Sequence, residues 1–383
     1  MDFLKPASEA DLAQMIRDAR GSLAVRGGGT RGAPHLAEQI LSTEELTGIQ
    51  LYEPGALTVV ARAGTPLSEV EATLASEGQR LAMEPPDMRS VLGRKGTPTI
   101  GGIVAANAAG PRRVQSGAVR DFLLGVRFVD GAGTIISNGG RVMKNVTGYD
   151  LVRLMAGSHG TLGVLSEVAL KVLPKPASQA LLIFSDLGVS DAVDLMSAAL
   201  ATPYEVTAAA HAPVGPDGSP VTYLRVEGSD ASVTYRTSEL AGQLGGWGTP
   251  EVVRDHAEAV EVMEWVRDAG PFQGTSGDLW KISVKPTDAP GVVEALGAEG
   301  VLLDWGGGRI WAEVAPGTDL RARFASKGHT TLVRAELATH ARLGTFQPEA
   351  APVAAISDGL RAKFDPKGIL NPGLMGRPRA EVI

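Results

Sequence analysis

A short apolar strand that runs into three consecutive glycines decides the fold: residues 23–32 read LAVRGGGTRG. Glycine lets the backbone adopt φ > 0 and approach a ligand closely, and successive amides in such a turn form an anion-binding concavity. A plain turn or a helix cap would use the same residues. The spacing matches neither the Gly-x-Gly-x-x-Gly of dinucleotide-binding folds nor the P-loop, so neither fold is predicted.

Two further segments rich in glycine and small residues follow, TPTIGGIVAANAAG at 97–110 and GSHGTLGV at 157–164. In the first, Gly101 and Gly102 expose backbone, and Asn107 offers donors and acceptors to the edge of a heterocycle. A packed small-residue helix is the alternative for this segment. The second suits close backbone contact with a ligand, and the alternative there is a surface loop leading into a strand.

Strand and helix patterns alternate around these segments and indicate a chain of two domains. The length of 383 residues favours the same division. Pro174-Lys175-Pro176 marks a natural boundary. Strands are expected at 23–25, 57–61, 122–128, 134–137, 180–184, 222–227 and 279–284, and helices at 8–20, from Thr65-Pro66 to Gly78, and at 192–201 and 257–267.

Composition excludes several classes of function. The formal net charge of −7 argues against nucleic-acid binding. Cysteine is absent, which excludes disulfides, thiolate zinc sites, cysteine-ligated iron–sulfur clusters and a cysteinyl flavin link. Residues 1–6, MDFLKP, lack the apolar core of a signal peptide, and no apolar run approaches the ~18 residues of a membrane span. We therefore expect a cytoplasmic protein, peripheral to a membrane only through its partners.

Five motifs in a fixed order carry a family resemblance. They are RGGGT at 26–30, TIGG at 99–102, KNVTGYD at 144–150, GSHGTLG at 157–163 and DPKGILNPG at 365–373. Together they resemble the vanillyl-alcohol-oxidase type of FAD-binding fold, the PCMH domain. Within that superfamily the chain is most similar to the FAD-binding E subunits of glycolate oxidases, over nearly its whole length.

The second domain carries the same resemblance in LWKIS at 279–283 and DWGGGRIW at 304–311. Two positions depart from it: Lys281 stands where the subunit usually has arginine, and Leu374 follows Asn-Pro-Gly where arginine is typical. The resemblance implies an α+β fold. A two-subdomain FAD-binding domain at 1–175 would precede a smaller α+β cap domain at 176–357, and 358–383 would return to the FAD domain.

The resemblance also implies which residues hold the FAD. The segment 26–32 would bind the pyrophosphate, 99–102 with Asn107 would line the ribityl and isoalloxazine region, and 157–164 would contact the adenosine side or the ring. Some members attach FAD to a histidine in the first loop, but Thr30 follows the glycines here, so non-covalent FAD is expected. The expected contacts are Arg26, Gly27, Gly28, Gly29, Thr30, Arg31, Gly32, Thr99, Ile100, Gly101, Gly102, Asn107, Gly157, Gly160, Thr161, Gly163, Val164 and Asn371.

Three cationic residues are candidates for catalysis. Lys144 near a reduced flavin would stabilise the negative charge that develops on its N1/O2 edge. Lys281 lies in a second-domain motif. Arg309 could pair with Asp304 or hold a carboxylate substrate, which suits its forked donors. No metal site is expected, because the His-x-His of hydroxyacid-oxidising relatives is missing, and the six histidines are interpreted as ordinary surface or satisfied residues.

The function implied is that of an FAD-binding subunit of a glycolate oxidase (glycolate dehydrogenase) complex. Glycolate, a 2-hydroxy acid, would be oxidised to glyoxylate, and the electrons would pass to an iron–sulfur subunit in a complex that also holds a larger FAD-binding sister subunit. A self-sufficient FAD-dependent 2-hydroxyacid oxidase or dehydrogenase is the second possibility. A structural or regulatory subunit with a vestigial flavin site is the third.

Overall fold

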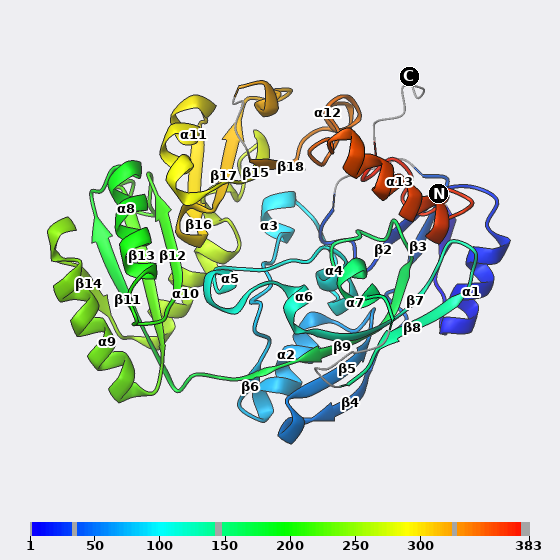
Figure 1. Ribbon diagram of the computed structural model, residues 1–383, viewed down its shortest axis with the longest axis horizontal. Helices are drawn as coiled ribbons and strands as arrows, with labels where there is room; N and C mark the ends of the chain where they lie inside the picture. The colour runs from blue at the N-terminus through cyan, green and yellow to red at the C-terminus, as the bar shows by residue number, and fades with distance from the viewer. Residues whose placement is uncertain (1, 33–36, 142–147, 324–327, 377–383) are drawn as a thin grey trace.

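A small parallel sheet and one helix open the N-terminal domain of the computed structural model, which describes residues 2–32, 37–141, 148–323 and 328–376 (Figure 1). Strands β1 (Asp2–Leu4) and β2 (Leu23–Arg26) flank β3 (Gln39–Ser42). Helix α1 (Glu9–Asp18) begins where the Ser8 hydroxyl accepts the amide of Asp11 at 3.1 Å, a standard N-cap. Its apolar side packs on this sheet.

A five-stranded antiparallel sheet forms the second half of the N-terminal domain. Its order is β4 (Ile49–Glu53), β5 (Thr58–Arg62), β9 (Val164–Lys171), β7 (Leu123–Val129) and β8 (Ile135–Gly139). The short strands β6 (Gln79–Arg80) and β10 (Leu173–Pro174) pair separately. The helices are α2 (Leu67–Ser76), α3 (Arg89–Leu92), α4 (Ile100–Ala105), α5 (Arg113–Ser116), α6 (Val119–Phe122) and α7 (Leu151–Met155), with the 3-10 turn η1 (Pro54–Ala56).

Helix α2 begins one residue later than expected from a proline, Pro66, at its first position and Thr65 as its cap. Thr65 does not cap the helix, because its hydroxyl donates to the carbonyl of Arg62 at 2.7 Å and accepts the amide of Gly48 at 3.0 Å. Pro66 therefore takes the N-cap position, and the helix starts at Leu67.

One eight-stranded antiparallel sheet builds the second domain. Its order is β14 (Glu251–Val253), β11 (Ser178–Ser185), β13 (Val221–Gly228), β12 (Val206–Ala212), β16 (Gly300–Asp304), β17 (Arg309–Val314), β15 (Asp278–Ser283) and β18 (His329–Arg334). Side chains alternate between its faces. Trp280 and Ile282 lie in the core covered by α8 (Val189–Leu200), α9 (Asp230–Gln243) and α11 (Ala289–Leu296).

The opposite face of this sheet is turned toward the N-terminal domain. Leu279 and Trp311 pack there with α10 (His256–Arg267) and with Met88 and Val91 of the N-terminal domain. The remaining short turns are η2 (Gly245–Trp247), η3 (Gly270–Phe272), η4 (Pro286–Asp288), η5 (Trp305–Gly307) and η6 (Leu320–Ala322).

The end of the chain returns to the N-terminal domain after α12 (Leu337–Leu343) (Figure 1). Helix α13 (Ala351–Phe364) places the ring of Phe364 6.1 Å from that of Phe128 on β7. Leu370 then bridges in parallel to Leu23 of β2. These helices and mostly antiparallel sheets confirm the α+β class. No helix among the described residues is long and apolar enough to cross a membrane.

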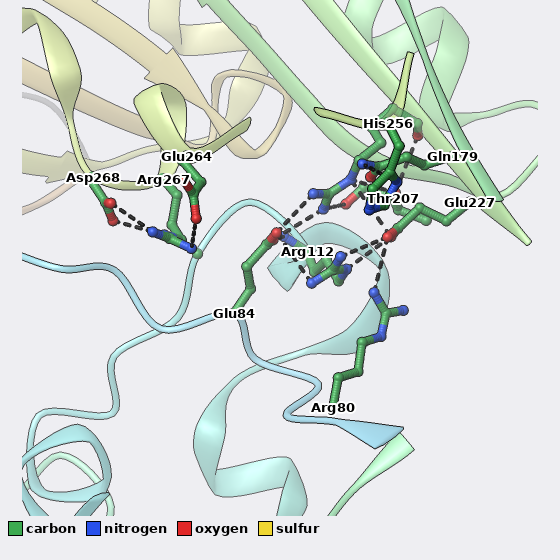
Figure 2. Close-up of polar contacts among 12 residues, drawn as sticks. Arg80, Glu84, Arg112, Gln179, Thr207, Glu227, His256, Glu264, Arg267 and Asp268 are labelled. Atoms are coloured by element: carbon green, nitrogen blue, oxygen red, sulfur yellow. Dashed lines mark hydrogen bonds and ion pairs between the residues drawn. The ribbon is translucent and has the colours of Figure 1, made fainter. Parts of the chain in front are cut away.

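Buried ion pairs join the two domains (Figure 2). Glu84 of the N-terminal domain accepts both terminal nitrogens of Arg225 on β13, at 2.8 and 3.0 Å. Glu227, also on β13, accepts Arg112 at 2.6 Å and Arg80 at 2.9 Å. Burial acts to raise the pKa of Glu227, but Arg225 and Arg112 outweigh it and hold that pKa far below its usual range. We call these five residues the domain-bridging ion pairs.

Replacing Glu227 with glutamine should destabilise the second domain. The substitution leaves buried arginines without their full counter-charge, which costs roughly 3–5 kcal/mol in the free energy of unfolding. All five tryptophans fall between residues 247 and 311, so urea unfolding followed by tryptophan fluorescence reports on this domain. Glu205→Gln is the matched control, because the Glu205 side chain is 70% exposed in its ion pair with Arg236 and should cost under about 1 kcal/mol.

The effect of Glu227→Gln should also depend on pH. The folded-state pKa of Glu227 is lowered from its ordinary 4.5, so its contribution is fully present above that value and is lost as the pH falls below it. The gap in unfolding free energy between the wild type and the variant should therefore be constant from pH 6 to 8 and narrow below about pH 4.5. A gap that stays the same at all pH values would show that Glu227 does not act through its charge.

Candidate functional site

The loop after β2 lies directly against the segment that precedes α4. A Cβ on Gly27 would overlap the hydroxyl of Thr99, and one on Gly28 would overlap the carbonyl oxygen of Thr97. Only glycine permits this approach, because any other residue would push the two segments apart. The contact brings together the first two glycine segments that the sequence singled out.

The third glycine segment is attached to both of the others. The amide of Gly157 donates to the carbonyl of Val104 at 3.3 Å, and that of His159 donates to the carbonyl of Ala105 at 2.9 Å. A Cβ on Gly160 would lie 3.1 Å from the side chain of Val25 at the end of β2. Segments far apart in the sequence, 26–32, 97–107 and 157–164, therefore form one continuous structure, here called the three glycine segments.

Asn371 ties the C-terminal segment to these loops. Its side-chain oxygen accepts the amide of Val25 at 2.7 Å, and its side-chain nitrogen donates to the carbonyl of His159 at 2.8 Å. Both His159 and Asn371 hold left-handed backbone, with φ of 50° and 43°. A single asparagine thus fixes the end of β2 relative to the loop at 157–164.

Unpaired backbone donors are concentrated in the first glycine segment. Within the described part of the chain, the amides of Gly28 to Gly32 donate to no protein acceptor. Gly29 and Gly32 have φ of +70° and +88°. The buried hydroxyl of Ser158 also has no hydrogen-bond partner there. A run of free amides suits a pyrophosphate, and a free hydroxyl suits the polar ribityl chain, so these residues fit FAD.

The amides of the second segment are already used by the protein. Those of Ile100 and Gly101 donate to the carbonyls of Thr65 and Ala63, and that of Gly102 donates to the Thr99 hydroxyl. This segment offers a ligand its Cα surface and side chains rather than its N–H groups. The glycines here serve close packing: a Cβ on Gly101 would lie 2.6 Å from that of Ala63.

Other predicted contact residues also make defined internal contacts. The Thr161 hydroxyl donates to the carbonyl of Ser158 at 2.7 Å, and the Asn107 side-chain oxygen accepts the amide of Arg120 at 3.1 Å. A Cβ on Gly163 would lie 2.6 Å from the ring of Phe128, and Val164 is buried at the start of β9. Lys144, like His35, lies outside the described residues.

Lys281 and Arg309 share the sheet face that is turned toward the N-terminal domain. Lys281 on β15 lies opposite Trp311 on β17 and Thr331 on β18. Arg309 lies two residues before Trp311 and so on the same face. The structure thus brings together two of the three candidate catalytic residues.

Arg309 and two tryptophans tie this face to the N-terminal domain. The Arg309 guanidinium pairs with buried Asp304 and donates to the carbonyl of Ala109 at 2.9 Å. Its carbon lies 4.2 Å from the ring centroid of Trp305, whose indole donates to the carbonyl of Gly110 at 3.0 Å. The Nε of Arg309 and the indole nitrogen of Trp311 have no partner among the described residues.

Four cations from both domains converge beside the glycine segments: Arg31, Arg113, Lys281 and Arg309, here called the cation cluster. Arg113 lies 4.7 Å from the ring centroid of Trp305. Burial, with Arg309, Arg113 and Arg31, lowers the pKa of Lys281 to about 8. Burial lowers the pKa of Arg31 to about 10, although Asp87 and Asp268 oppose it. Of the four, only Arg309 has an ion-pair partner within the described residues.

His159 and Arg113 are candidate residues that sequence reasoning did not select. The imidazole of His159 lies 4.8 Å from the ring of Phe346. Burial, with Lys281 and Arg31, lowers the pKa of His159 to about 4. The position of His159 inside the Gly-Ser-His-Gly motif was the sequence signal that could have identified it as a site residue. Arg113 carried none, because its role depends on Trp305, far away in the sequence.

A separate cavity of about 330 Å³ lies beside the domain-bridging ion pairs. Arg80, Arg112, Gln179 and His256 are among its lining residues, and none of the three glycine segments contributes to it. The cluster of cations and free amides, rather than this cavity, is therefore the candidate functional site.

Known proteins resemble this chain in sequence. Residues 3–139 match the family model described as an FAD binding domain. Glycolate oxidase subunit GlcE of Escherichia coli is 36% identical over 330 residues, which cover 86% of this chain and 84% of that protein. Glycolate oxidase subunit GlcD of Bacillus subtilis is 34% identical over 145 residues, 38% of this chain and 27% of that protein.

A solved structure shares the fold. That of alkyldihydroxyacetonephosphate synthase superposes with a TM-score of 0.68 over 97% of this chain and 76% of that one, at 14% identity. Such identity speaks for the fold alone. The identity to GlcE extends over most of both chains, and the FAD-binding match falls on the domain that holds the free amides. The chain therefore belongs to the glycolate oxidase subunit GlcE family and is an FAD-dependent oxidoreductase.

Proposed function

We propose that this chain is the FAD-binding subunit of a glycolate oxidase complex, in which glycolate is oxidised to glyoxylate. The observation that carries the proposal is the cation cluster, which faces the glycine segments and in which, among the described residues, only Arg309 has an ion-pair partner, Asp304. A small carboxylate is the complementary ligand, because guanidinium and ammonium groups bind carboxylates through charge-assisted hydrogen bonds. Its position beside the FAD-binding loops suits oxidation at the carbon next to that carboxylate.

The residues that would hold FAD are the eighteen listed from the sequence, with the free amides of Gly28 to Gly32 at its pyrophosphate. Ser158 joins them, because its buried hydroxyl lacks a partner among the described residues. FAD when bound supplies the acceptor for a hydride. The proposed boundaries remain 1–175 for the FAD domain, 176–357 for the cap and 358–383 for the returning segment.

The chain's own side chains would bind and orient the acid. Arg309 is held in place by Asp304 and Trp305, and its Nε, which has no partner among the described residues, could donate to the acid. Lys281 adds a mobile donor beside it, and the indole of Trp311 adds another. The packed sheet face and the glycine segments would together keep water away from the acid.

An iron–sulfur partner and a larger FAD-binding sister subunit complete the proposal. The chain has no cysteine, so it supplies no thiolate ligands for a cluster of its own, and the electrons need another route out. The match to GlcD is confined to 145 residues, which is consistent with a sister subunit that resembles part of this chain.

A turnover assay with and without partners tests the proposed function. The FAD-loaded chain should reduce an artificial acceptor with glycolate only after the sister and iron–sulfur subunits are added. Turnover by the chain alone would favour a self-sufficient oxidase. A protein that stays colourless when FAD is added would favour a structural subunit.

Gly28→Val should abolish FAD binding, because its side chain would overlap the carbonyl of Thr97 and move the loop with the free amides. The measurement is the flavin absorbance at about 450 nm after gel filtration with added FAD. Circular dichroism separates this loss from general unfolding. Gly55→Ala is the control, since a Cβ there meets nothing within 4 Å. A Gly28→Val protein that retains full FAD would remove this loop from the site.

Lys281→Met should weaken the binding of oxalate, a carboxylate without a hydrogen to transfer. A charged hydrogen bond contributes about 1.5–3 kcal/mol, so the Kd should rise by roughly 10- to 100-fold. The change in flavin absorbance on titration reports the binding. Lys285→Met, at an exposed position on the following turn, should leave the Kd unchanged.

The same titration should depend on pH in a defined direction. The pKa of Lys281 is about 8, so the charge that attracts oxalate is present below that pH and lost above it. Affinity should therefore fall as the pH rises through 8 in the wild type. Lys281→Arg should bind oxalate without that fall, because arginine stays charged. A fall of the same size in the arginine variant would assign the titration to another group.

A further inference from the structure

His159 lies where the glycine segments meet the charged face of the second domain. Lys281 lies opposite Thr331, and Thr331 bridges to Phe346, so their side chains form one row across the sheet. The imidazole of His159 continues this row, with its centroid 4.8 Å from that of Phe346. A residue of the FAD-binding loop thus reaches the row that carries the candidate carboxylate ligand.

The backbone of His159 is fixed, while its ring is free to bond. Its amide and carbonyl are both used, by Ala105 and Asn371, but neither ring nitrogen has a hydrogen-bond partner among the described residues. The residue as a whole is partly exposed. By contrast, His211 and His340 each bond a threonine hydroxyl through Nδ1, at 2.9 and 3.1 Å.

The charges that face this imidazole are all positive. Lys281 approaches from β15 and Arg31 from the loop after β2, and both disfavour its protonation. Further out, Arg309 and Arg113 act on Lys281, and burial together with Lys281 lowers the pKa of His329 on β18. Burial and these cations hold the pKa of His159 at about 4. The ring is therefore a neutral acceptor when no anion is present.

We propose that His159 accepts the hydroxyl proton of a 2-hydroxy acid whose carboxylate is held by the cation cluster, and that the bound carboxylate makes the imidazole basic enough to do so. The inference rests on the proposed function. The O–H bond breaks and its proton goes to a ring nitrogen. FAD, when bound, would supply the acceptor for the C2 hydrogen and its bonding electron pair, so the C–O bond would become a carbonyl and the acid would lose two electrons and two hydrogens.

The carboxylate of the bound acid would offset the positive charges of Lys281 and Arg31, which disfavour protonation of His159. An opposite charge within about 4–6 Å favours the charged form of a group, so occupation of the cluster should raise the pKa of His159. A general base works best when its pKa lies near the operating pH. Substrate binding would thus bring His159 into that range only when the acid is in place.

Proton uptake on binding of oxalate tests this without turnover. In the FAD-loaded chain with ¹³C-labelled histidine rings, NMR should show the pKa of His159 rise by at least about two pH units when oxalate saturates the site. His340 is the matched control, since burial lowers its pKa also to about 4 and it bonds Thr345 instead. Its titration should not move.

His159→Asn separates proton uptake from binding, because asparagine tolerates the left-handed backbone at this position. Calorimetry at pH 6 in two buffers of different ionisation enthalpy should show uptake of a proton with oxalate in the wild type and none in the variant. The variant should keep its flavin and, at pH 8, where the wild-type imidazole stays neutral with or without oxalate, an oxalate Kd within about two-fold of the wild type. In the assembled complex it should lose roughly 10²–10⁴-fold in kcat.

The outcomes separate the two proposals. Oxalate that binds without moving the His159 titration overturns the role of His159 and leaves the carboxylate site standing. Oxalate that leaves the flavin spectrum unchanged at any concentration overturns the proposed function together with the inference. A titration that moves equally at His159 and His340 would reflect a general change in the protein and would also overturn the inference.

Discussion

The site depends first on the buried ion pair between Glu84 and Arg225. Each member lies in a different domain, and Arg225 is 1% exposed, so the pair forms only while the domains are in contact, and loss of either member would leave an uncompensated charge buried between them. Arg112 and Glu227 extend the pair into a network that fixes the orientation of the eight-stranded sheet. Because that orientation is fixed, the same sheet face can present Lys281 and Arg309 to the N-terminal domain.

Close backbone contact fixes the glycine segments relative to one another, as the buried ion pairs fix the two domains. Gly27 and Gly28 lie against Thr97 and Thr99 with no room for a side chain. Asn371 then bonds β2 and the loop at 157–164 together from the far end of the chain. The result is a rigid support on which the amides of the first loop remain unpaired among the described residues and available to an anion.

The free amides of the first loop and the cation cluster both create a positive electrostatic potential. Free amides and a group of cations meet in a chain whose formal net charge is −7, so the positive potential is local and not a property of the whole surface. Burying Lys281 and Arg31 is unfavourable without a counter-charge, and the lowered pKa values of both express that cost. Two anionic partners, a pyrophosphate and a carboxylate, would relieve it.

The sequence by itself determined the α+β class, the FAD cofactor and the family, because these follow from local signals: glycines after a strand, and motifs in a fixed order. It also selected Lys281 and Arg309, and it left open whether Arg309 pairs with Asp304, which the structure shows that it does. Only the tertiary structure brought Arg113 to Trp305 and His159 to Phe346. It also showed that the amides of Ile100 and Gly101 are already bonded. These outcomes depend on contacts between residues 35 to 192 positions apart, and no short-range pattern in a chain records which distant groups will share a buried interface.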